Sequence, residues 1–213
     1  MGESSRAAAP AWTAAELWGE LFPAGGDVEI EIGSGDGTFL IASARRRPDR
    51  NFLGIERSPS KAKRIEERLR KLGASNVRLL QADAACVLGR MLPTASVAAY
   101  HVYFPDPWPK RGHAGRRIFR PALVDELART LRAGGPLYLA TDVASYASVA
   151  HGLVRGHPAF AEAPTGADHP GLTTAFARKY RAAGRPLYVF TFDRRPEEGA
   201  DQILVAASKM RSM

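Results

Sequence analysis

The sequence has almost no cysteine: Cys86 is the only one among 213 residues. A single cysteine cannot form a disulfide within the chain, which excludes a disulfide-built secreted fold and favours a reducing compartment. No apolar run approaches the roughly 20 residues that a membrane-spanning helix needs. The first residues also lack the charged and then apolar pattern of an export signal. We therefore expect a cytoplasmic protein that does not enter membranes.

Several catalytic signatures are missing as well. The chain contains neither the G-x-S-x-G turn of serine hydrolases nor the G-x-x-x-x-G-K-[ST] loop of P-loop nucleotidases. Its five histidines show no metal-ligand spacing with cysteine or acids, so no metal site is expected. Cys86 has no evident base partner, which favours a small packing residue over a nucleophile.

Positive charge, in contrast, is in excess. The chain has 30 Lys and Arg against 22 Asp and Glu, a formal net charge of +8, and 45% hydrophobic residues, as in globular proteins. An excess of cations fits a polyanionic partner, because basic side chains displace condensed counterions from a phosphate backbone. An Arg-rich and Ala-rich composition produces the same charge without such a partner, so charge alone leaves both interpretations open.

Strands and helices are predicted to alternate along most of the chain. Strands are expected over 28–32, 52–56, 77–81, 97–103 and 137–141, and helices over 13–21, 38–47, 59–72, 84–91, 121–131 and 146–155. This alternation predicts an α/β fold with a doubly wound, mostly parallel, Rossmann-like sheet. Two further strands, over 187–192 and 203–207, are expected to pair antiparallel at a sheet edge.

Glycines and acids follow the predicted strands, at the edge where doubly wound sheets bind ligands. Gly33, Gly35 and Gly37 permit a tight turn and a close ligand approach, but their spacing differs from the G-x-G-x-x-G of dinucleotide sites. The acids at neighbouring strand ends are Glu31, Glu56 and Asp83. Glu56 is placed to accept from ribose hydroxyls, and Asp83 from an adenine amino group. Acids without phosphate-binding features favour an adenosyl sulfonium cofactor, which carries positive charge.

The densest motif is the loop after the fourth strand. It reads F-P-D-P-W-P-K from Phe104 to Lys110, and its three prolines fix the backbone so that Asp106 lies on a stiff loop. Basic residues continue to Arg120, and their attachment to a rigid acidic turn favours phosphate contact over a solvated face. Trp108 offers a flat face to a base or caps the core, and both interpretations stay open.

These residues together resemble the bacterial tRNA (guanine-N7)-methyltransferases, a family of class I S-adenosyl-L-methionine enzymes. The resemblance spans roughly residues 21–194, and its most specific element is the F-P-D-P-W-P-K motif with Arg116 and Arg117 downstream. Supporting matches are Glu31-Ile-Gly33-x-Gly35-x-Gly37, Gly54-Ile-Glu56, Asp83-Ala84, Leu131-x-x-Gly134-Gly135, Ala140-Thr-Asp142 and Thr174-x-Phe176 with Lys179. The resemblance implies the class I methyltransferase sheet with an antiparallel carboxy-terminal edge.

The resemblance also implies a reaction and a set of site residues. The reaction is methyl transfer from S-adenosyl-L-methionine to N7 of a variable-loop guanine in tRNA, with Asp106 as the catalytic residue. The residues implied to bind the cofactor are Glu31, Gly33, Gly35, Gly37, Glu56, Asp83, Ala84 and Asp106. Those implied to bind the RNA are Lys110, Arg116, Arg117, Asp142, Thr174, Phe176 and Lys179.

One domain with two short appendages is the expected organisation. Residues 1–26 would form a partly helical segment, residues 27–194 the methyltransferase domain, and residues 195–213 an extension that adds an edge strand. A monomer and a homodimer are both compatible with the sequence.

Departures from the family pattern keep two other functions open. Gly112 and Gly115 stand where the family has basic residues, Ala177 stands where it has glutamate, and Arg6 is the only basic residue before Glu31. A methyltransferase of the same fold that acts on a small purine or another heteroaromatic metabolite would fit these departures. A noncatalytic RNA-binding protein with a vestigial cofactor pocket is the second alternative, although the intact acids argue against it.

Overall fold

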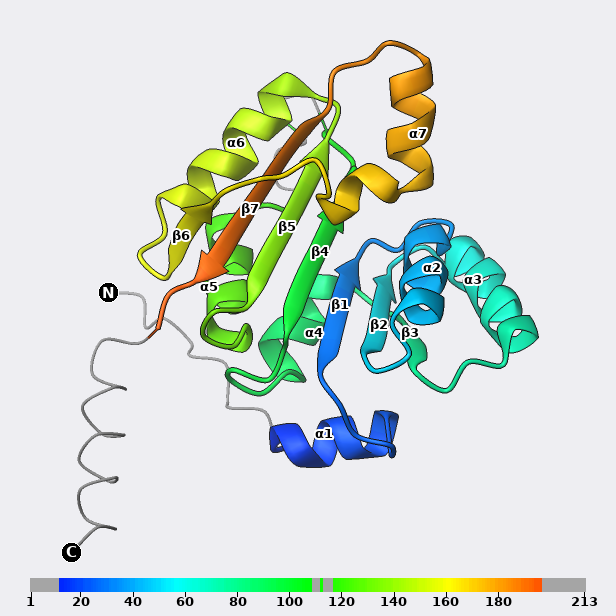
Figure 1. Ribbon diagram of the computed structural model, residues 1–213. Helices are drawn as coiled ribbons and strands as arrows, with labels where there is room; N and C mark the ends of the chain where they lie inside the picture. Colours follow the sequence, from blue (N-terminus) through cyan, green and yellow to red (C-terminus); the bar gives the residue numbers. More distant parts are fainter. Residues whose placement is uncertain (1–11, 109–111, 113–116, 197–213) are drawn as a thin grey trace, which may run out of the picture.

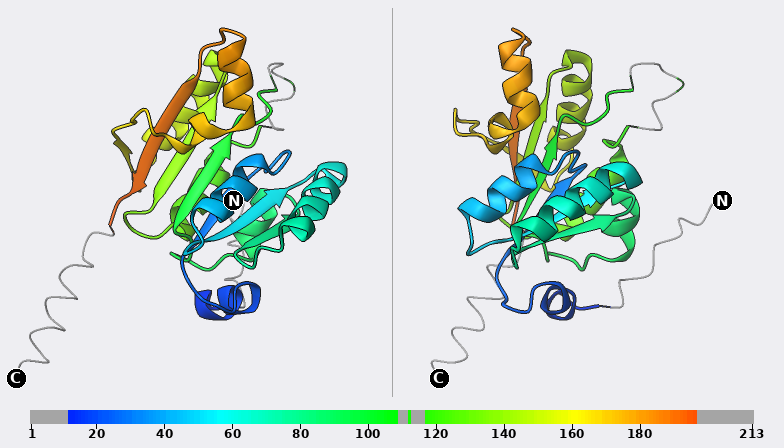
Figure 2. Two further views of the ribbon diagram at one scale, coloured as in Figure 1. Left: turned by 45° about the vertical axis from the view of Figure 1, so that its right-hand side comes forward. Right: turned by 90° about the vertical axis from the view of Figure 1, so that its right-hand side faces the viewer.

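A computed structural model describes residues 12–108, 112 and 117–196. A seven-stranded sheet with the order β3-β2-β1-β4-β5-β7-β6 forms its centre, with helices on both faces (Figures 1 and 2). The strands are β1 (Val28–Ile32), β2 (Asn51–Glu56), β3 (Val77–Gln81), β4 (Ala99–Tyr103), β5 (Pro136–Thr141), β6 (Phe160–Ala163) and β7 (Tyr188–Arg194). The helices are α1 (Ala14–Leu21), α2 (Thr38–Arg46), α3 (Pro59–Leu72), α4 (Ala84–Arg90), α5 (Pro121–Thr130), α6 (Ala144–Arg155), η2 (Pro170–Thr173) and α7 (Ala175–Ala182). The expected α/β class and mostly parallel sheet are confirmed.

Strands β1 to β5 pair in parallel and are covered on both faces. On one face, α2 and α3 pack over the sheet through Leu40, Phe52 and Ile65. On the other, α4 and α5 pack over a larger core that includes Tyr100 and Leu127. Burial on both faces explains why β1, β2 and β4 are buried along their full lengths, as is typical of parallel sheets.

The antiparallel end of the sheet differs from the expectation. Strand β7 pairs antiparallel with β5 and with β6, so it is second from the edge, and β6 is the edge strand. The four residues of β6 form too short a segment to show an alternating pattern, and that strand was not predicted. Residues 203–207, expected as a strand, and residues 197–202 and 208–213 lie outside the described part of the chain.

Two smaller differences concern other elements. Helix α7 was not predicted, because only Ala177 among its eight residues is buried and the helix is too short to show a repeated apolar pattern. The fourth strand begins at Ala99 and not at Val97, which forms an isolated bridge to Leu131. Within the described ranges, no helix combines the length and the apolar character needed to cross a membrane.

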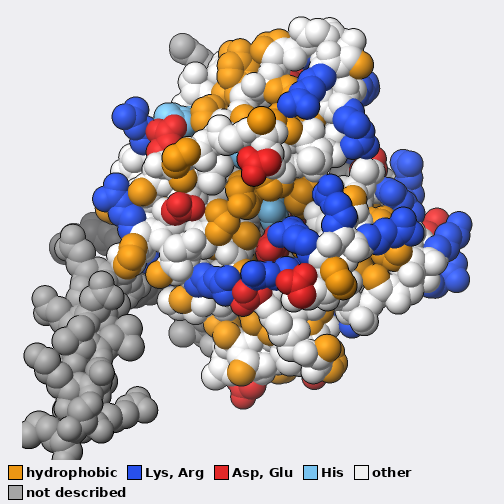
Figure 3. Space-filling model, viewed as in Figure 1, with side chains coloured by type: hydrophobic (Ala, Val, Ile, Leu, Met, Phe, Trp, Pro, Cys, Tyr) orange, Lys and Arg blue, Asp and Glu red, His pale blue; other side chains and the backbone are white. Residues whose placement is uncertain are grey.

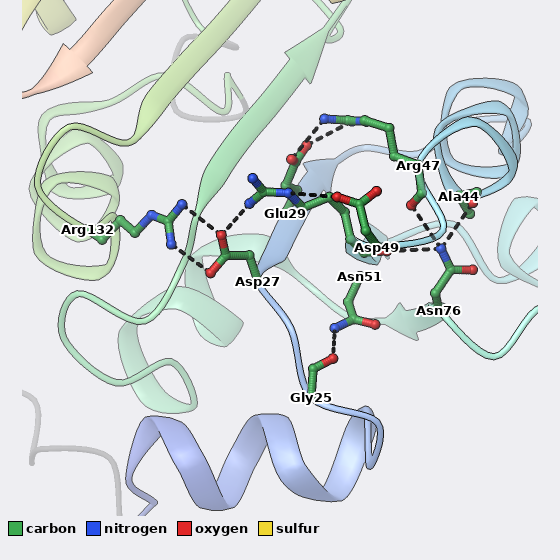
Figure 4. A network of polar contacts seen from close by, with 10 residues as sticks. Gly25, Asp27, Glu29, Ala44, Arg47, Asp49, Asn51, Asn76 and Arg132 are labelled. Atoms are coloured by element: carbon green, nitrogen blue, oxygen red, sulfur yellow. Dashed lines mark hydrogen bonds and ion pairs between the residues drawn. The ribbon is translucent and has the colours of Figure 1, made fainter.

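Arginines pair with the acids at the amino-terminal end of β1 (Figure 4). Glu29 accepts two hydrogen bonds of 2.9 Å from the guanidinium of Arg47. Asp27 forms ion pairs with Arg132, at 2.7 Å, and with Arg50. The hydrogen bond from Arg132 lowers the pKa of Asp27, since it stabilises the ionised carboxylate. The acids at this end of the strand therefore serve the fold.

Gly54 in β2 marks the closest approach of α2 to the sheet, and a substitution there tests this packing. A Cβ atom at Gly54 would lie 2.6 Å from Ser34 Oγ and 2.7 Å from Leu40 Cδ2. We expect Gly54→Ala to lower the free energy of unfolding by about 1–3 kcal/mol, because the buried site is overpacked. Urea unfolding monitored by circular dichroism measures the change.

Gly152→Ala in α6 is the matched control, since no atom lies within 4 Å of a Cβ atom at that position. This variant should keep the wild-type stability or gain about 0.5–1 kcal/mol, because alanine favours a helix over glycine. Equal stabilities of the two variants would contradict the close packing at Gly54.

Candidate active site

A cavity of about 630 Å³ opens at the carboxyl ends of β1 to β4. Ligands in doubly wound sheets bind at this edge. The cavity brings together six of the residues singled out from the sequence: Gly33, Glu56, Asp83, Ala84, Asp106 and Arg117. These residues come from four separate segments of the chain, so the fold and not the sequence order assembles the site.

The glycine turn after β1 sets the position of Glu56. Gly33, Gly35 and Gly37 all have positive φ angles, of 79°, 58° and 72°, a region that glycine adopts without a steric penalty. Gly37 also faces α3 closely, since a Cβ atom there would lie 3.0 Å from Ile65 Cγ2. The turn directs the Gly35 amide toward Glu56, and its N–H donates to Oε2 at 2.9 Å.

Backbone amides orient Glu56 and Asp83, two of the three acids that line the cavity, and leave them acceptor positions. Glu56 Oε1 accepts from the Ser58 amide at 2.8 Å, so each oxygen of Glu56 has one backbone donor and further lone pairs. Asp83 Oδ1 accepts from the amides of Ala85 and Cys86 at the start of α4, and neither bond uses Oδ2. Both carboxylates are therefore held in place and can still accept hydrogen bonds from hydroxyl or amino groups of a ligand.

Glu31 differs from every acid at the amino-terminal end of β1. Its side chain is buried, and Oε2 has no hydrogen-bond partner among the described residues. Burial raises the pKa of Glu31 well above its ordinary value, and the nearby charges of Asp36 and Glu56 act in the same direction. An ionised carboxylate without a partner is costly to bury, so this position would be stabilised by a cationic ligand.

Strain and hydrogen bonds define the loop that carries Asp106. Phe104 and Trp108 have φ angles of 49° and 40°, and such conformations cost about 1–3 kcal/mol each outside glycine. The Phe104 amide donates to Ala140 O at 2.7 Å, which fixes the start of the loop. Asp106 is exposed and lines the cavity, and the half-buried Trp108 lines it too. Conformations of this cost persist where the surroundings enforce them, often at functional sites.

Arg117 supports this loop, a role that the sequence did not indicate. Its Nε donates to the carbonyls of Pro107 and Trp108 at 3.1 and 3.2 Å, and its Nη2 donates to Trp108 O at 3.0 Å. Contact of Arg117 with RNA phosphates stays a prediction. Lys110, Arg116 and Gly115 lie outside the described residues, and Gly112 is exposed.

The remaining residues implied to bind RNA lie around η2 and α7, outside the lining of the cavity. Thr174 caps α7: its Oγ1 accepts from the Ala177 amide at 3.0 Å and donates to Gly171 O. Phe176 is 43% exposed, and a Cβ atom at Gly35 would lie 3.8 Å from its ring. Helix α7 therefore packs against the glycine turn, and Lys179 lies exposed on the same helix.

Aromatic residues join α7 to the loop of Asp106, and one of them, Tyr180, was not singled out from the sequence. The ring centroids of Phe104 and Phe176 are 6.0 Å apart, and Tyr180 lies 5.4 Å from Phe104. Arg185 stacks on Tyr180 at 4.4 Å and forms an ion pair with Asp142. The ion pair occupies the carboxylate of Asp142 in this structure, and its contact with a base stays a prediction.

A buried polar chain also ends at the cavity. His101 Nε2 lies 2.9 Å from Glu29 Oε2, and its Nδ1 lies 2.6 Å from the hydroxyl of Tyr103, a residue that lines the cavity. Burial lowers the pKa of His101, which favours a neutral ring that donates to Glu29 and accepts from Tyr103. Alternation along β4 was the available signal, since both residues lie on the same face of that strand.

Within the described ranges, no group of three or more His, Cys, Asp or Glu residues is arranged to hold a metal ion. The cavity instead combines its acids with basic residues. Arg120, the end of the basic run noted in the sequence, lines the cavity, and the basic lining residues that the sequence did not single out are Arg57 and Lys61.

Comparisons with known proteins identify similar chains. The family described as "Putative methyltransferase" matches residues 26–190. The tRNA (guanine-N(7)-)-methyltransferase of Azorhizobium caulinodans is 40% identical over 179 residues, which cover 79% of this chain and 76% of that protein. The enzyme of the same name from Nitrosococcus oceani is 40% identical over 131 residues, which cover 62% of this chain and only 56% of that protein.

Solved structures share the fold. The 16S rRNA methyltransferase KamB superposes with a TM-score of 0.63 at 21% identity, covering 87% of this chain and 95% of that one. The antibiotic-resistance methyltransferase Kmr gives a TM-score of 0.58 at 20% identity, covering 88% and 95%. At these identities the likeness concerns the fold alone.

Replacement of Glu31 tests whether it is an uncompensated buried acid. Folding raises the pKa of this carboxyl, so the folded chain binds the proton more tightly and the unfolding free energy falls as pH rises above about 4.5. We expect Glu31→Gln to be more stable than the wild type at pH 8, with a difference that shrinks toward pH 4. Each 1 kcal/mol gained should raise Tm by about 2–4 °C.

Glu29→Gln is the matched control, two residues earlier on the same face of β1. It removes the carboxylate that pairs with Arg47 and His101, and loss of one partner of such hydrogen bonds typically costs about 1–3 kcal/mol. Thermal melts of both variants across pH give the comparison. A Glu31→Gln variant as destabilised as Glu29→Gln would show that Glu31 supports the fold.

Proposed function

The chain belongs to the tRNA (guanine-N7)-methyltransferase family, and from this membership we propose that it transfers a methyl group from S-adenosyl-L-methionine to N7 of a guanine in tRNA. One structural observation supports the proposal above others: Oε2 of the buried Glu31 has no hydrogen-bond partner among the described residues, and Glu31 lies near the carboxyl end of β1, beside the cavity that Glu56, Asp83 and Asp106 line. The matched part of the chain spans 56% of the length of the Nitrosococcus oceani relative and 76% of the Azorhizobium caulinodans relative.

The residues present fit the cofactor. S-adenosyl-L-methionine supplies an activated methyl group on a positive sulfur, and it also carries an ammonium group, a ribose diol and an adenine. Glu56, fixed by the amides of Gly35 and Ser58, retains acceptor positions suited to the ribose hydroxyls. Asp83 retains Oδ2 for the adenine amino group. Glu31 offers the negative charge that a cationic group of the ligand would compensate.

Methylation of guanine N7 places limited demands on the protein. N7 is an acceptor with a lone pair in the neutral base, so no proton has to leave before the attack. Catalysis then depends on alignment of the base with the methyl group, and positioning of this kind contributes up to roughly 7–11 kcal/mol. The strained and braced loop of Asp106 is suited to this task, because its geometry is fixed before the substrate binds.

Asp106 provides charge where the reaction needs it. Positive charge moves from the sulfonium to the purine, and a fixed carboxylate beside the base stabilises the transition state. The same carboxylate can accept from the N1 and N2 hydrogens of guanine. The exposed Phe176, with Phe104 and Tyr180 behind it, offers an aromatic surface on which a base can stack.

The reaction itself is tested with labelled cofactor. Incubation with labelled S-adenosyl-L-methionine and unmodified bulk tRNA, followed by digestion to nucleosides, should yield labelled 7-methylguanosine. A parallel incubation with a panel of free purines should stay unlabelled. Label in the purines alone, or in no product at all, would contradict the proposal and favour one of the two other functions considered from the sequence.

Substitution of Asp106 separates its two proposed roles. We expect Asp106→Ala to lower kcat by about 100- to 1000-fold, as for removal of one transition-state contact, while the Kd for S-adenosyl-L-methionine changes by less than about tenfold. Single-turnover kinetics and calorimetry give the two values. A similar loss in both would assign Asp106 to cofactor binding alone, and Asp83→Ala, expected to act mainly on Kd, provides the comparison.

A further inference from the structure

One face of helix α3 carries basic residues only. Ala62 and Ile65 are buried against the sheet, with Leu69 and Leu72 beside them. The basic residues Lys61, Arg64, Arg68 and Lys71, which we name the α3 stripe, are all exposed and follow one another at intervals of three and four positions. This spacing places all four side chains on the same face of the helix. The stripe extends over about 15 Å, at 1.5 Å per residue.

The opposite flank of α3 has a mixed composition and serves as an internal comparison. Lys63 and Arg70 are exposed there, together with the acid Glu66. Glu67, three positions after Arg64 and four before Lys71, is exposed between this flank and the α3 stripe. The stripe itself contains no acid.

The α3 stripe has no close carboxylate partner in the described part of the chain. Among the residues that the structure describes, none of its four members forms an ion pair with a carboxylate. Like charges three and four positions apart destabilise an isolated helix, so the arrangement does not serve helix stability. Four unpaired cations on one face instead produce a positive potential that attracts a polyanion.

The stripe is continuous with the candidate active site. Lys61, at its amino-terminal end, lines the cavity. Arg68 donates a hydrogen bond to the carbonyl of Asp36 in the glycine turn, which directs this face of α3 toward the active edge of the sheet. Figure 3 shows Lys and Arg side chains gathered over the side of the molecule that α2 and α3 form in Figure 1.

We propose that the α3 stripe binds phosphates of the tRNA backbone beyond the methylated nucleotide. The proposal rests on the proposed function for the identity of the polyanion. A polynucleotide that enters the cavity with one base must continue across the surrounding surface, and the stripe leads away from the cavity along α3. Backbone contacts position the nucleic acid without reading its sequence, which suits unpaired Lys and Arg side chains.

The test compares two pairs of substitutions with equal change in charge. Arg64→Gln with Lys71→Gln alters the stripe and avoids both Lys61 in the cavity and Arg68 on the glycine turn. Lys63→Gln with Arg70→Gln alters the mixed flank of the same helix. Fluorescence anisotropy with bulk tRNA at several salt concentrations gives Kd and its salt dependence, and melting curves show whether both variants fold.

We expect the stripe variant to bind tRNA about tenfold more weakly near 0.1 M salt, with kcat and cofactor affinity unchanged. The slope of log K against log salt concentration should fall by about 1.4–1.8, the value for two lost phosphate contacts. The flank variant should keep the wild-type slope. Equal effects of the two pairs of substitutions would show that only the net charge of α3 matters for tRNA binding, and no effect of either would show that α3 does not bind tRNA. Both results would overturn the proposal.

Failure of the proposed function gives a different result. A wild-type protein that binds tRNA through the stripe and yet forms no 7-methylguanosine would contradict the proposed function and leave the stripe in place. A wild-type protein that binds no tRNA would overturn both.

Discussion

The structure depends on a contrast between the carboxylates at the two ends of strand β1. At the amino-terminal end, Asp27 and Glu29 are neutralised by arginines, and these contacts serve folding. At the carboxyl end, Glu31 is buried with a raised pKa, and its Oε2 has no hydrogen-bond partner in the part of the chain that the structure describes. The fold therefore compensates the charges of Asp27 and Glu29 but leaves the carboxylate of Glu31 uncompensated, which lowers the stability of the protein. A cationic ligand beside Glu31 would explain why such a residue is present.

The geometry around these acids follows from backbone constraints. Glycines with positive φ angles form the turn whose amide donates a hydrogen bond to Glu56. Hydrogen bonds from Arg117 hold the strained loop from Phe104 to Trp108. Both are rigid before any ligand binds, which suits a reaction that requires alignment more than proton transfer. Helix α7 completes the arrangement by packing aromatic side chains against the same turn.

The sequence was sufficient for the parallel part of the fold, because apolar strands, glycine turns and amphipathic helices leave local patterns. Helix α3 has the expected bounds, and the cavity contains Glu56, Asp83 and Asp106 as expected from their positions after strands. Strand β6 and helix α7 could not be predicted from the sequence. Strand β6 is too short to show an alternating pattern, and α7 is a short helix that packs through aromatic side chains. Tertiary contacts such as Arg117 to Trp108 O, or Arg185 to Asp142, join residues whose spacing carries no signal.

Proton release on cofactor binding tests the central claim most directly. A carboxyl with a raised pKa keeps its proton to higher pH than an ordinary glutamate, and a cationic ligand beside it favours ionisation. Calorimetric titration of S-adenosyl-L-methionine in buffers of different ionisation enthalpy, between about pH 5 and 8, measures the protons released. We expect net proton release on binding at a pH above the ordinary pKa of glutamate, and its loss in the Glu31→Gln variant. Binding with no proton exchange at any pH, or with the same exchange in the variant, would contradict the account.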